Sequence, residues 1–131
     1  MDMSNNPELS RLWCYSNQLT SLDVSRCAAL TELQCDSNKL TSLDVSNNTA
    51  LTDLRCQSNQ LTSLDVSHCA ALTNLQCPGN KLTSLDVSHN LALTNLVCHK
   101  SPLLTEIWLK TGQVIDNFIY DTSVAAIKYK D

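Results

Sequence analysis

Aromatic residues, glycine, proline and long apolar runs are all scarce in this chain of 131 residues. Aromatic side chains make up 5% of the sequence, and there are only 2 Gly and 3 Pro. With so little glycine, no Gly-rich loop is available to cradle a phosphate. No apolar run approaches the ~20 residues that a membrane-spanning helix needs. We therefore expect no membrane span.

Charge of either sign is also sparse. Charged residues are 17% of the chain and the formal net charge is -4. No block of lysines or arginines provides the basic stripe that a nucleic-acid backbone requires, so we expect no nucleic-acid partner. The first residues, MDMSNNPELSRLW, lack the cationic and apolar segments of a secretion signal. The compartment of this chain stays unknown at this stage.

A repeat dominates what is present. The letters LTSLDVS occur at residues 19–25, 40–46, 61–67 and 82–88, always at the same interval. The whole chain divides accordingly into a partial repeat (1–8), full repeats (9–29, 30–50, 51–71, 72–92), a divergent last repeat (93–110) and a C-terminal cap (111–131). A unit this short cannot bury its own leucines, so neighbouring units must stack. We predict one solenoid domain of about five turns.

Period-2 alternation predicts the path of each turn. In LQC of the second full repeat, Leu33 and Cys35 point inward and Gln34 points outward, as in a short strand. Stacked copies would form a parallel sheet. The LTSLDVS half also predicts an extended segment, with Leu43 and Val45 inward. We expect a mainly β fold with little or no helix and a β-rich C-terminal cap.

Two columns of identical residues run along the predicted stack. One contains Asn17, Asn38, Asn59 and Asn80, and the other contains Cys14, Cys35, Cys56, Cys77 and Cys98. We expect the asparagine amides to satisfy buried backbone groups from turn to turn. The thiols are predicted to be free, small and buried, since a straight column does not converge on a metal ion as tetrahedral zinc requires. No cofactor or metal is expected.

A further column contains aspartates, Asp23, Asp44, Asp65 and Asp86. Stacked carboxylates repel, and a cation between turns would relieve the repulsion. We favour hydrogen bonds from neighbouring Ser and Thr hydroxyls instead, because each turn offers one carboxylate flanked by serines. A cation or an ice surface along this column remain the alternatives.

The pattern LxxLxCxxNxL is that of a leucine-rich repeat. Over residues 2–110 the units resemble the leucine-rich repeats common in Bacteroidetes surface and secreted proteins. This resemblance implies a solenoid fold, a parent protein that is secreted or displayed at the cell surface, and a role in interaction.

The residues that differ between repeats predict where a ligand would bind. They lie outward around the LxC strand, where neighbouring turns would stack them into one face. The candidate binding residues are Arg11, Trp13, Tyr15, Glu32, Gln34, Asp36, Asp53, Arg55, Gln57, Gln76, Val97 and His99, together with Trp108. Trp, Tyr and Arg are typical of binding hot spots. We therefore predict a protein or glycan ligand.

No positioned nucleophile argues for catalysis, because the cysteines face inward and serine occurs in every turn. The alternative to a binding module is a purely structural scaffold, an engineered or truncated repeat fragment with no ligand. Residues 2–6 align with 44–48, inside a half-repeat, which predicts a fragment or a design. An uncapped N-terminal edge would favour a homodimer.

Overall fold

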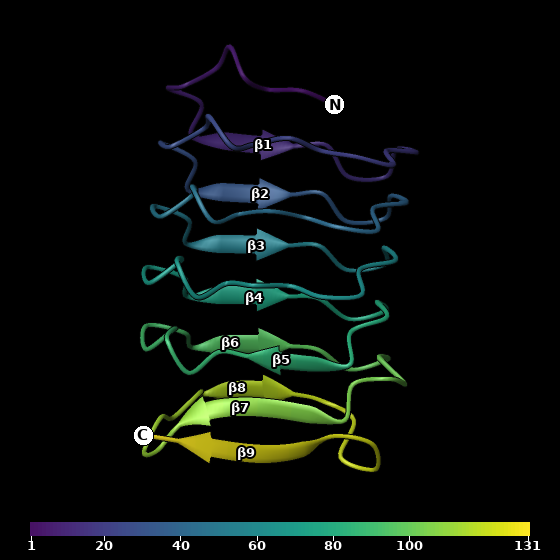
Figure 1. Cartoon of the computed structure of the whole chain (residues 1–131), viewed down its shortest axis with the longest axis vertical. Coiled ribbons are helices and arrows are strands. Elements are labelled where there is room, and N and C mark those ends of the chain that lie inside the picture. Colours follow the sequence, from purple (N-terminus) through teal and green to yellow (C-terminus); the bar gives the residue numbers. More distant parts are fainter.

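The computed structural model describes residues 1–131 and shows a stack of turns with parallel strands along its length (Figure 1). The strands are β1 (Arg11–Trp13), β2 (Glu32–Gln34), β3 (Asp53–Arg55), β4 (Asn74–Gln76), β5 (Ser84–Asp86), β6 (Asn95–Val97), β7 (Glu106–Lys110), β8 (Asn117–Ile119) and β9 (Ala126–Lys130). The prediction of a mainly β parallel solenoid is confirmed. The structure has no helix with the length and apolar character needed to cross a membrane.

The five LxC strands and β8 form a six-stranded sheet in the order β1-β2-β3-β4-β6-β8. Their register follows the repeat, since Leu33 of β2 pairs with Leu12 on one side and Leu54 on the other. The middle residue of β2 is buried and its two neighbours are partly exposed. This is the alternation that one buried face of a short strand produces.

The LTSLDVS half is extended but forms a regular sheet only near the C-terminus. There β5, β7 and β9 make a three-stranded sheet. In the second full repeat Leu43 and Val45 are buried while Ser42 and Asp44 are exposed, although residues 43–45 belong to no strand. The predicted direction of these side chains is confirmed.

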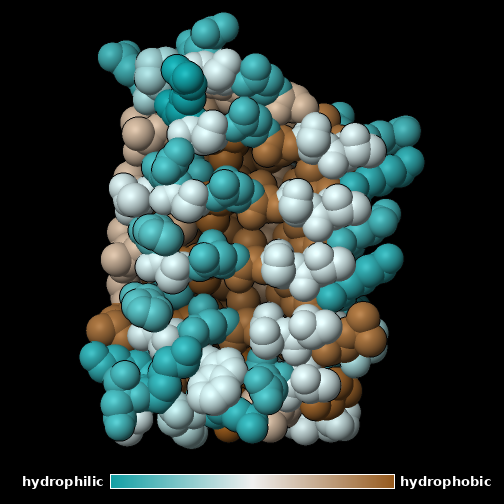
Figure 2. Space-filling view, viewed as in Figure 1, coloured by the Kyte–Doolittle hydropathy of each residue, from teal (hydrophilic) through white to brown (hydrophobic).

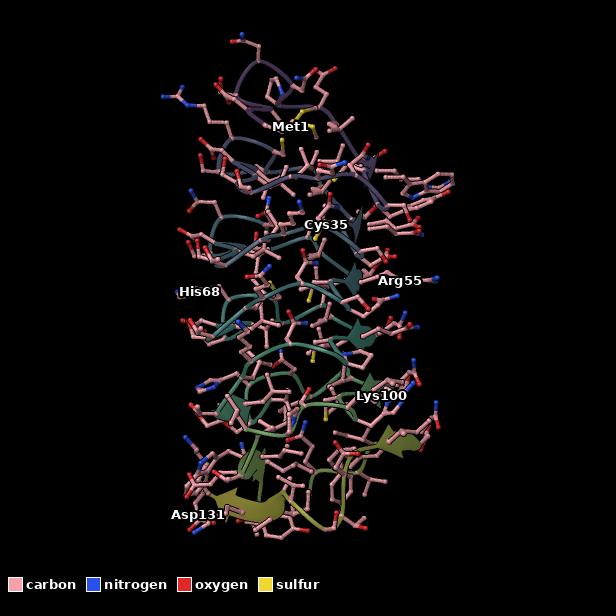
Figure 3. The ribbon with its side chains drawn as sticks, turned by 90° about the vertical axis from the view of Figure 1, so that its right-hand side faces the viewer. Met1, Cys35, Arg55, His68, Lys100 and Asp131 are labelled. Atoms are coloured by element: carbon pink, nitrogen blue, oxygen red, sulfur yellow. The ribbon has the colours of Figure 1, made fainter.

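The core lies between the two halves of each turn, and Cys35 lies inside it in Figure 3. Leu33 and Cys35 have 0% exposure, whereas Leu12 and Cys14 in the first turn have 9% and 7%. All seven cysteines are free and buried, including the five of the column for which the sequence predicts it. The first turn is therefore less covered than the second.

The asparagine ladder is present, as predicted. Asn59 Nδ2 donates to the carbonyl oxygens of Cys35 and Cys56, both at 3.1 Å. Its Oδ1 accepts the N–H of Leu40 at 3.0 Å. Asn38 and Asn80 repeat this pattern and link their own turns to the preceding turns. Asn17 in the first turn donates only to carbonyls of its own turn.

A second column, in the LTSLDVS half, alternates Cys with Asn. Asn48 Nδ2 donates to the carbonyl oxygens of Val24 and Cys27 at 3.0 Å. Asn48 Oδ1 is buried without a partner, and so is Asn90 Oδ1. Cys69 Sγ donates weakly to the Asn48 carbonyl at 3.6 Å. This column therefore needs a donor only, which explains why Cys and Asn share it.

The C-terminal cap continues both sheets. Strand β8 pairs with β6 as the sixth strand of the large sheet, and β9 pairs with β7. The stack thus has about one turn more than expected. The repeat pattern does not predict this extra turn. Asn117 follows its partner Asn95 at a spacing one residue longer than that of the regular repeats.

Candidate functional site

The outward side chains of the six-stranded sheet form one continuous surface, here called the variable face. Within each strand the first and third residues project to the same side, while the central residue enters the core. Arg55 extends from this side of the stack and His68 lies on the other (Figure 3). The face has a column that begins at Arg11, a second that begins at Trp13 and a third that begins at Tyr15, two residues beyond it.

The structure places all but one of the candidate residues on the variable face. Trp108 does not lie there, because it belongs to β7 in the other sheet and pairs with Asp86 and Lys128. The structure adds Asn117 and Ile119 of β8, which continue the first two columns. The only sequence signal for them is the likeness of NFI to NLV, displaced by the longer spacing.

Exposed aromatic residues are concentrated at the N-terminal end of this face. Trp13 is 57% exposed and Tyr15 is 48% exposed. Glu32 orients the indole by accepting a hydrogen bond from Trp13 Nε1 at 3.0 Å. The same carboxylate accepts Gln34 Nε2 at 2.6 Å and lies 3.6 Å from Arg11 Nε. Glu32 is therefore fully engaged within the chain.

The centre of the face has an internal polar network. Arg55 donates to both carboxylate oxygens of Asp53, at 3.2 and 3.1 Å, and these hydrogen bonds raise the pKa of Arg55. Asn74 Nδ2 also donates to Asp53 Oδ1 at 3.0 Å, Asn95 donates to Asn74, and Asn117 donates to Asn95. Many polar side chains of the first column are thus hydrogen-bonded to one another. The sequence did not predict this contact pattern.

The opposite side of the stack presents the constant LTSLDVS residues. Ser46 donates to Asp44 Oδ1 through its N–H at 2.9 Å and its hydroxyl at 2.6 Å. The serine hydroxyl and N–H lower the pKa of Asp44. The expected bonding of carboxylate to serine is confirmed. Lys130 forms an ion pair with Asp86 at 2.7 Å.

Shallow hollows lie between adjacent turns on this side, and Figure 2 shows an apolar strip running along it between polar columns. The largest hollow is about 440 Å³ and has Leu64 as its single apolar residue, among serines, Asp65, Asp86 and His89. No group of three or more His, Cys, Asp or Glu side chains could hold a metal ion.

The buried cysteines lack the properties of a reactive site. Burial raises the pKa of Cys35 and Cys98 to about 12 and that of Cys69 to about 11. Burial also places the pKa of Cys56 and Cys77 well above the ordinary value. Since the thiolate is the nucleophile and the metal ligand, these thiols act as core side chains.

Comparison with known proteins finds similar repeats. Residues 36–54 match the family described as Leucine Rich repeat. The functional domain of InlJ from Listeria monocytogenes, which includes a cysteine ladder, aligns with 99% of this chain at 32% identity and a TM-score of 0.77. An internalin, inlF from Listeria monocytogenes str. 4b F2365, aligns with 98% at 18% identity and a TM-score of 0.57. No curated protein sequence matches.

The two solved structures are longer than this chain. It covers 32% of the InlJ chain and 49% of the inlF chain. At 18% identity the inlF comparison concerns the fold alone. The InlJ domain is described as including a cysteine ladder, and this chain likewise has a column of buried cysteines.

Proposed function

We propose that this leucine-rich-repeat protein is a non-catalytic interaction module that binds a protein or glycan ligand on the variable face. One observation carries the proposal. The letters LTSLDVS are identical in four repeats, whereas the side chains that differ from turn to turn project together from the six-stranded sheet. A scaffold that stays constant while one face changes is the arrangement that solenoids use for binding.

The composition of the face supports this function. Trp13 and Tyr15 are exposed at one end, and Arg55 projects near the middle. These residue types dominate interface hot spots. Each of the six strands has two outward positions, and a third follows it in the chain, which gives about 18 positions. This is fewer than the roughly 20 to 30 residues per side of a standard interface. We therefore expect weak binding by this chain alone.

The proposal extends to the parent protein, which we place among secreted or surface-displayed bacterial proteins. The similarity to the InlJ domain supports this placement, and the units also resemble Bacteroidetes repeats. Without a reactive thiol, the module supplies contact surface and no catalysis.

A purely structural scaffold is the second candidate. The network from Asp53 through Asn74 to Asn117 favours it, because these side chains form hydrogen bonds with each other and leave fewer groups for a ligand.

The N-terminal end of the stack could instead form a homodimer. There β1 is an edge strand, and Leu19 is only partly buried, whereas Leu40 in the next turn has 0% exposure. Light scattering would detect such a dimer.

A binding screen tests the proposed function. The chain is assayed against a panel of extracellular proteins and glycans, beside a Trp13→Ala, Arg55→Ala double variant. A Ser42→Ala, Ser63→Ala variant on the opposite side is the matched control. We expect the Trp13→Ala, Arg55→Ala variant to lose binding of any ligand that is found, and the serine variant to retain it. Ligands that depend on the serines, or no ligand at all, would overturn the proposal in favour of another surface or of the scaffold.

A further inference from the structure

The two tryptophans of this chain lie in similar local settings on different sheets. Trp13 Nε1 donates to Glu32 at 3.0 Å, and Trp108 Nε1 donates to Glu106 at 3.2 Å. In each case a carboxylate orients the indole and leaves a ring face available. The two sites differ in what covers that face.

Ammonium groups of the chain itself cover Trp108. Lys130 Nζ lies 5.1 Å and Lys128 Nζ 5.9 Å from the ring centroid. Each lysine also reaches a carboxylate, with Lys130 at 2.7 Å from Asp86 and Lys128 at 3.6 Å from Glu106. The site combines attraction to the negative face of an aromatic ring with an ion pair. It shows how this scaffold holds a cationic side chain.

The corresponding position at Trp13 is open. Trp13 is 57% exposed and has no cationic group over its ring, since Arg11 pairs with Glu32 instead. Tyr15 projects on the same side and is 48% exposed. In the next turn Asp36 follows Tyr15 in its column, as the bond from Ser16 N–H to the Asp36 carbonyl shows.

Asp36 is the free carboxylate of this corner. Its side chain accepts only a long hydrogen bond from the Ser37 hydroxyl at 3.4 Å and forms no ion pair. Trp13, Tyr15 and Asp36 together are called the aromatic corner. They offer two exposed rings and one negative charge, whereas the lysines at Trp108 contact one ring and two carboxylates, Asp86 and Glu106.

We propose that the aromatic corner binds a cationic side chain, preferably arginine, from a basic segment of a protein partner. The proposal rests on the proposed function of the variable face and names the chemistry of its ligand. A guanidinium group stacks flat on an aromatic ring while its N–H groups reach a carboxylate, which an ammonium does less well. The net charge of -4 also favours the approach of a cation.

Intrinsic fluorescence tests the corner directly. In a Trp108→Phe chain, Trp13 is the single tryptophan, because the sequence contains 2 Trp. This chain is titrated with a capped tetra-arginine peptide, and with tetra-lysine, tetra-glutamate and a neutral oligosaccharide as comparison probes. We expect saturable binding of tetra-arginine, weaker binding of tetra-lysine, and loss of both as salt screens the charges.

Matched variants separate the corner from general attraction to an acidic chain. Tyr15→Ala and Asp36→Asn should each weaken tetra-arginine binding about two- to fivefold, the size of one exposed cation–π contact or ion pair. Asp44→Asn removes an exposed carboxylate on the opposite side and should leave binding unchanged. Equal losses for Asp36→Asn and Asp44→Asn would overturn the proposal. So would saturable binding of the oligosaccharide without the peptide, or no binding of tetra-arginine.

The two proposals fail separately. If the screen finds a protein whose binding needs Trp13 and Arg55 while tetra-arginine does not bind, the interaction function stands and the cationic ligand is wrong. If tetra-arginine binds at the corner and the screen finds no ligand on the face, the corner's preference stands and the proposed function is wrong.

Discussion

Asn59 donates a hydrogen bond to the carbonyl oxygen of Cys35, 24 residues earlier in the chain, at 3.1 Å. The same amide donates to Cys56 in its own turn and accepts the N–H of Leu40. A single side chain therefore satisfies backbone groups in two turns, where each would otherwise be buried without a partner. The constancy of this asparagine among the repeats follows from that double role.

Replacing Asn59 by alanine should lower the free energy of unfolding by about 3 kcal/mol, because several buried backbone groups lose their partner. Asn17→Ala is the matched control. Asn17 is exposed and donates only to carbonyls of its own turn, Cys14 and Tyr15, so its loss should be below about 1 kcal/mol. Urea unfolding measures both. Equal losses would show that the bonds between turns contribute little.

The second column should tolerate an exchange that the first does not. Asn48→Cys places a weak donor where Cys27 and Cys69 already occur, and Asn48 Oδ1 has no partner to lose. We expect a change below about 1 kcal/mol in the free energy of unfolding. Asn59→Cys removes an acceptor as well as donors and should cost about 2 kcal/mol or more. A similar cost at both positions would contradict the different roles of the columns.

The aspartate column should make the fold sensitive to acid. Hydrogen bonds from the following serines lower the pKa of Asp23, Asp44 and Asp65 below the ordinary 3.8. The unfolded chain then binds protons before the folded chain does, so this stabilisation is present above the unfolded pKa and is lost as pH falls towards the folded pKa. Melting temperatures between about pH 6 and pH 2.5 should therefore fall most steeply at the acid end.

Ser46→Ala supplies the comparison for this acid effect. It removes the hydroxyl that donates to Asp44, and the pKa of Asp44 should return towards its ordinary value. The variant should lose stability near neutral pH and show a shallower decline at low pH. An unchanged pH profile would mean that the serine hydroxyl does not set the pKa of Asp44.

Alkylation of the native protein should show that the cysteine of the first turn reacts faster than the cysteines of the interior turns. Cys14 lies in the less covered first turn and is 7% exposed, whereas Cys35, Cys56 and Cys77 have 0% exposure. Iodoacetamide treatment followed by mass spectrometry should find Cys14 modified first. The interior three should react only as fast as the whole chain unfolds. Modification of Cys56 at the rate of Cys14 would contradict a continuous dry core.

The repeated turns could be predicted because the need to bury leucines recurs at a constant interval along the chain. Leucines at fixed intervals must share an interior, and the alternation of Leu33, Gln34 and Cys35 then assigns each side chain to a face. The asparagine ladder follows from the same logic, since a buried turn needs a partner for its backbone groups.

Three features depended on information that the period does not contain. The sixth strand begins at Asn117, one residue later than the regular interval from Asn95 would place it, so the repeat indicated no position for it. Trp108 was assigned to the variable face although it belongs to the other sheet. The chain of hydrogen bonds from Asp53 to Asn117 depends on how neighbouring amides orient, which sequence spacing does not specify.

The central claim is that constant residues build the coil while the outward residues of the LxC strands are free to vary. A face exchange tests it most directly, with Asp53→Glu, Arg55→Gln and Gln57→Asp giving the third turn the outward residues of the second. Its free energy of unfolding, measured in urea, should lie within about 1 kcal/mol of the parent, as for surface substitutions. A loss as large as that of Asn59→Ala, in the same turn, would contradict the claim.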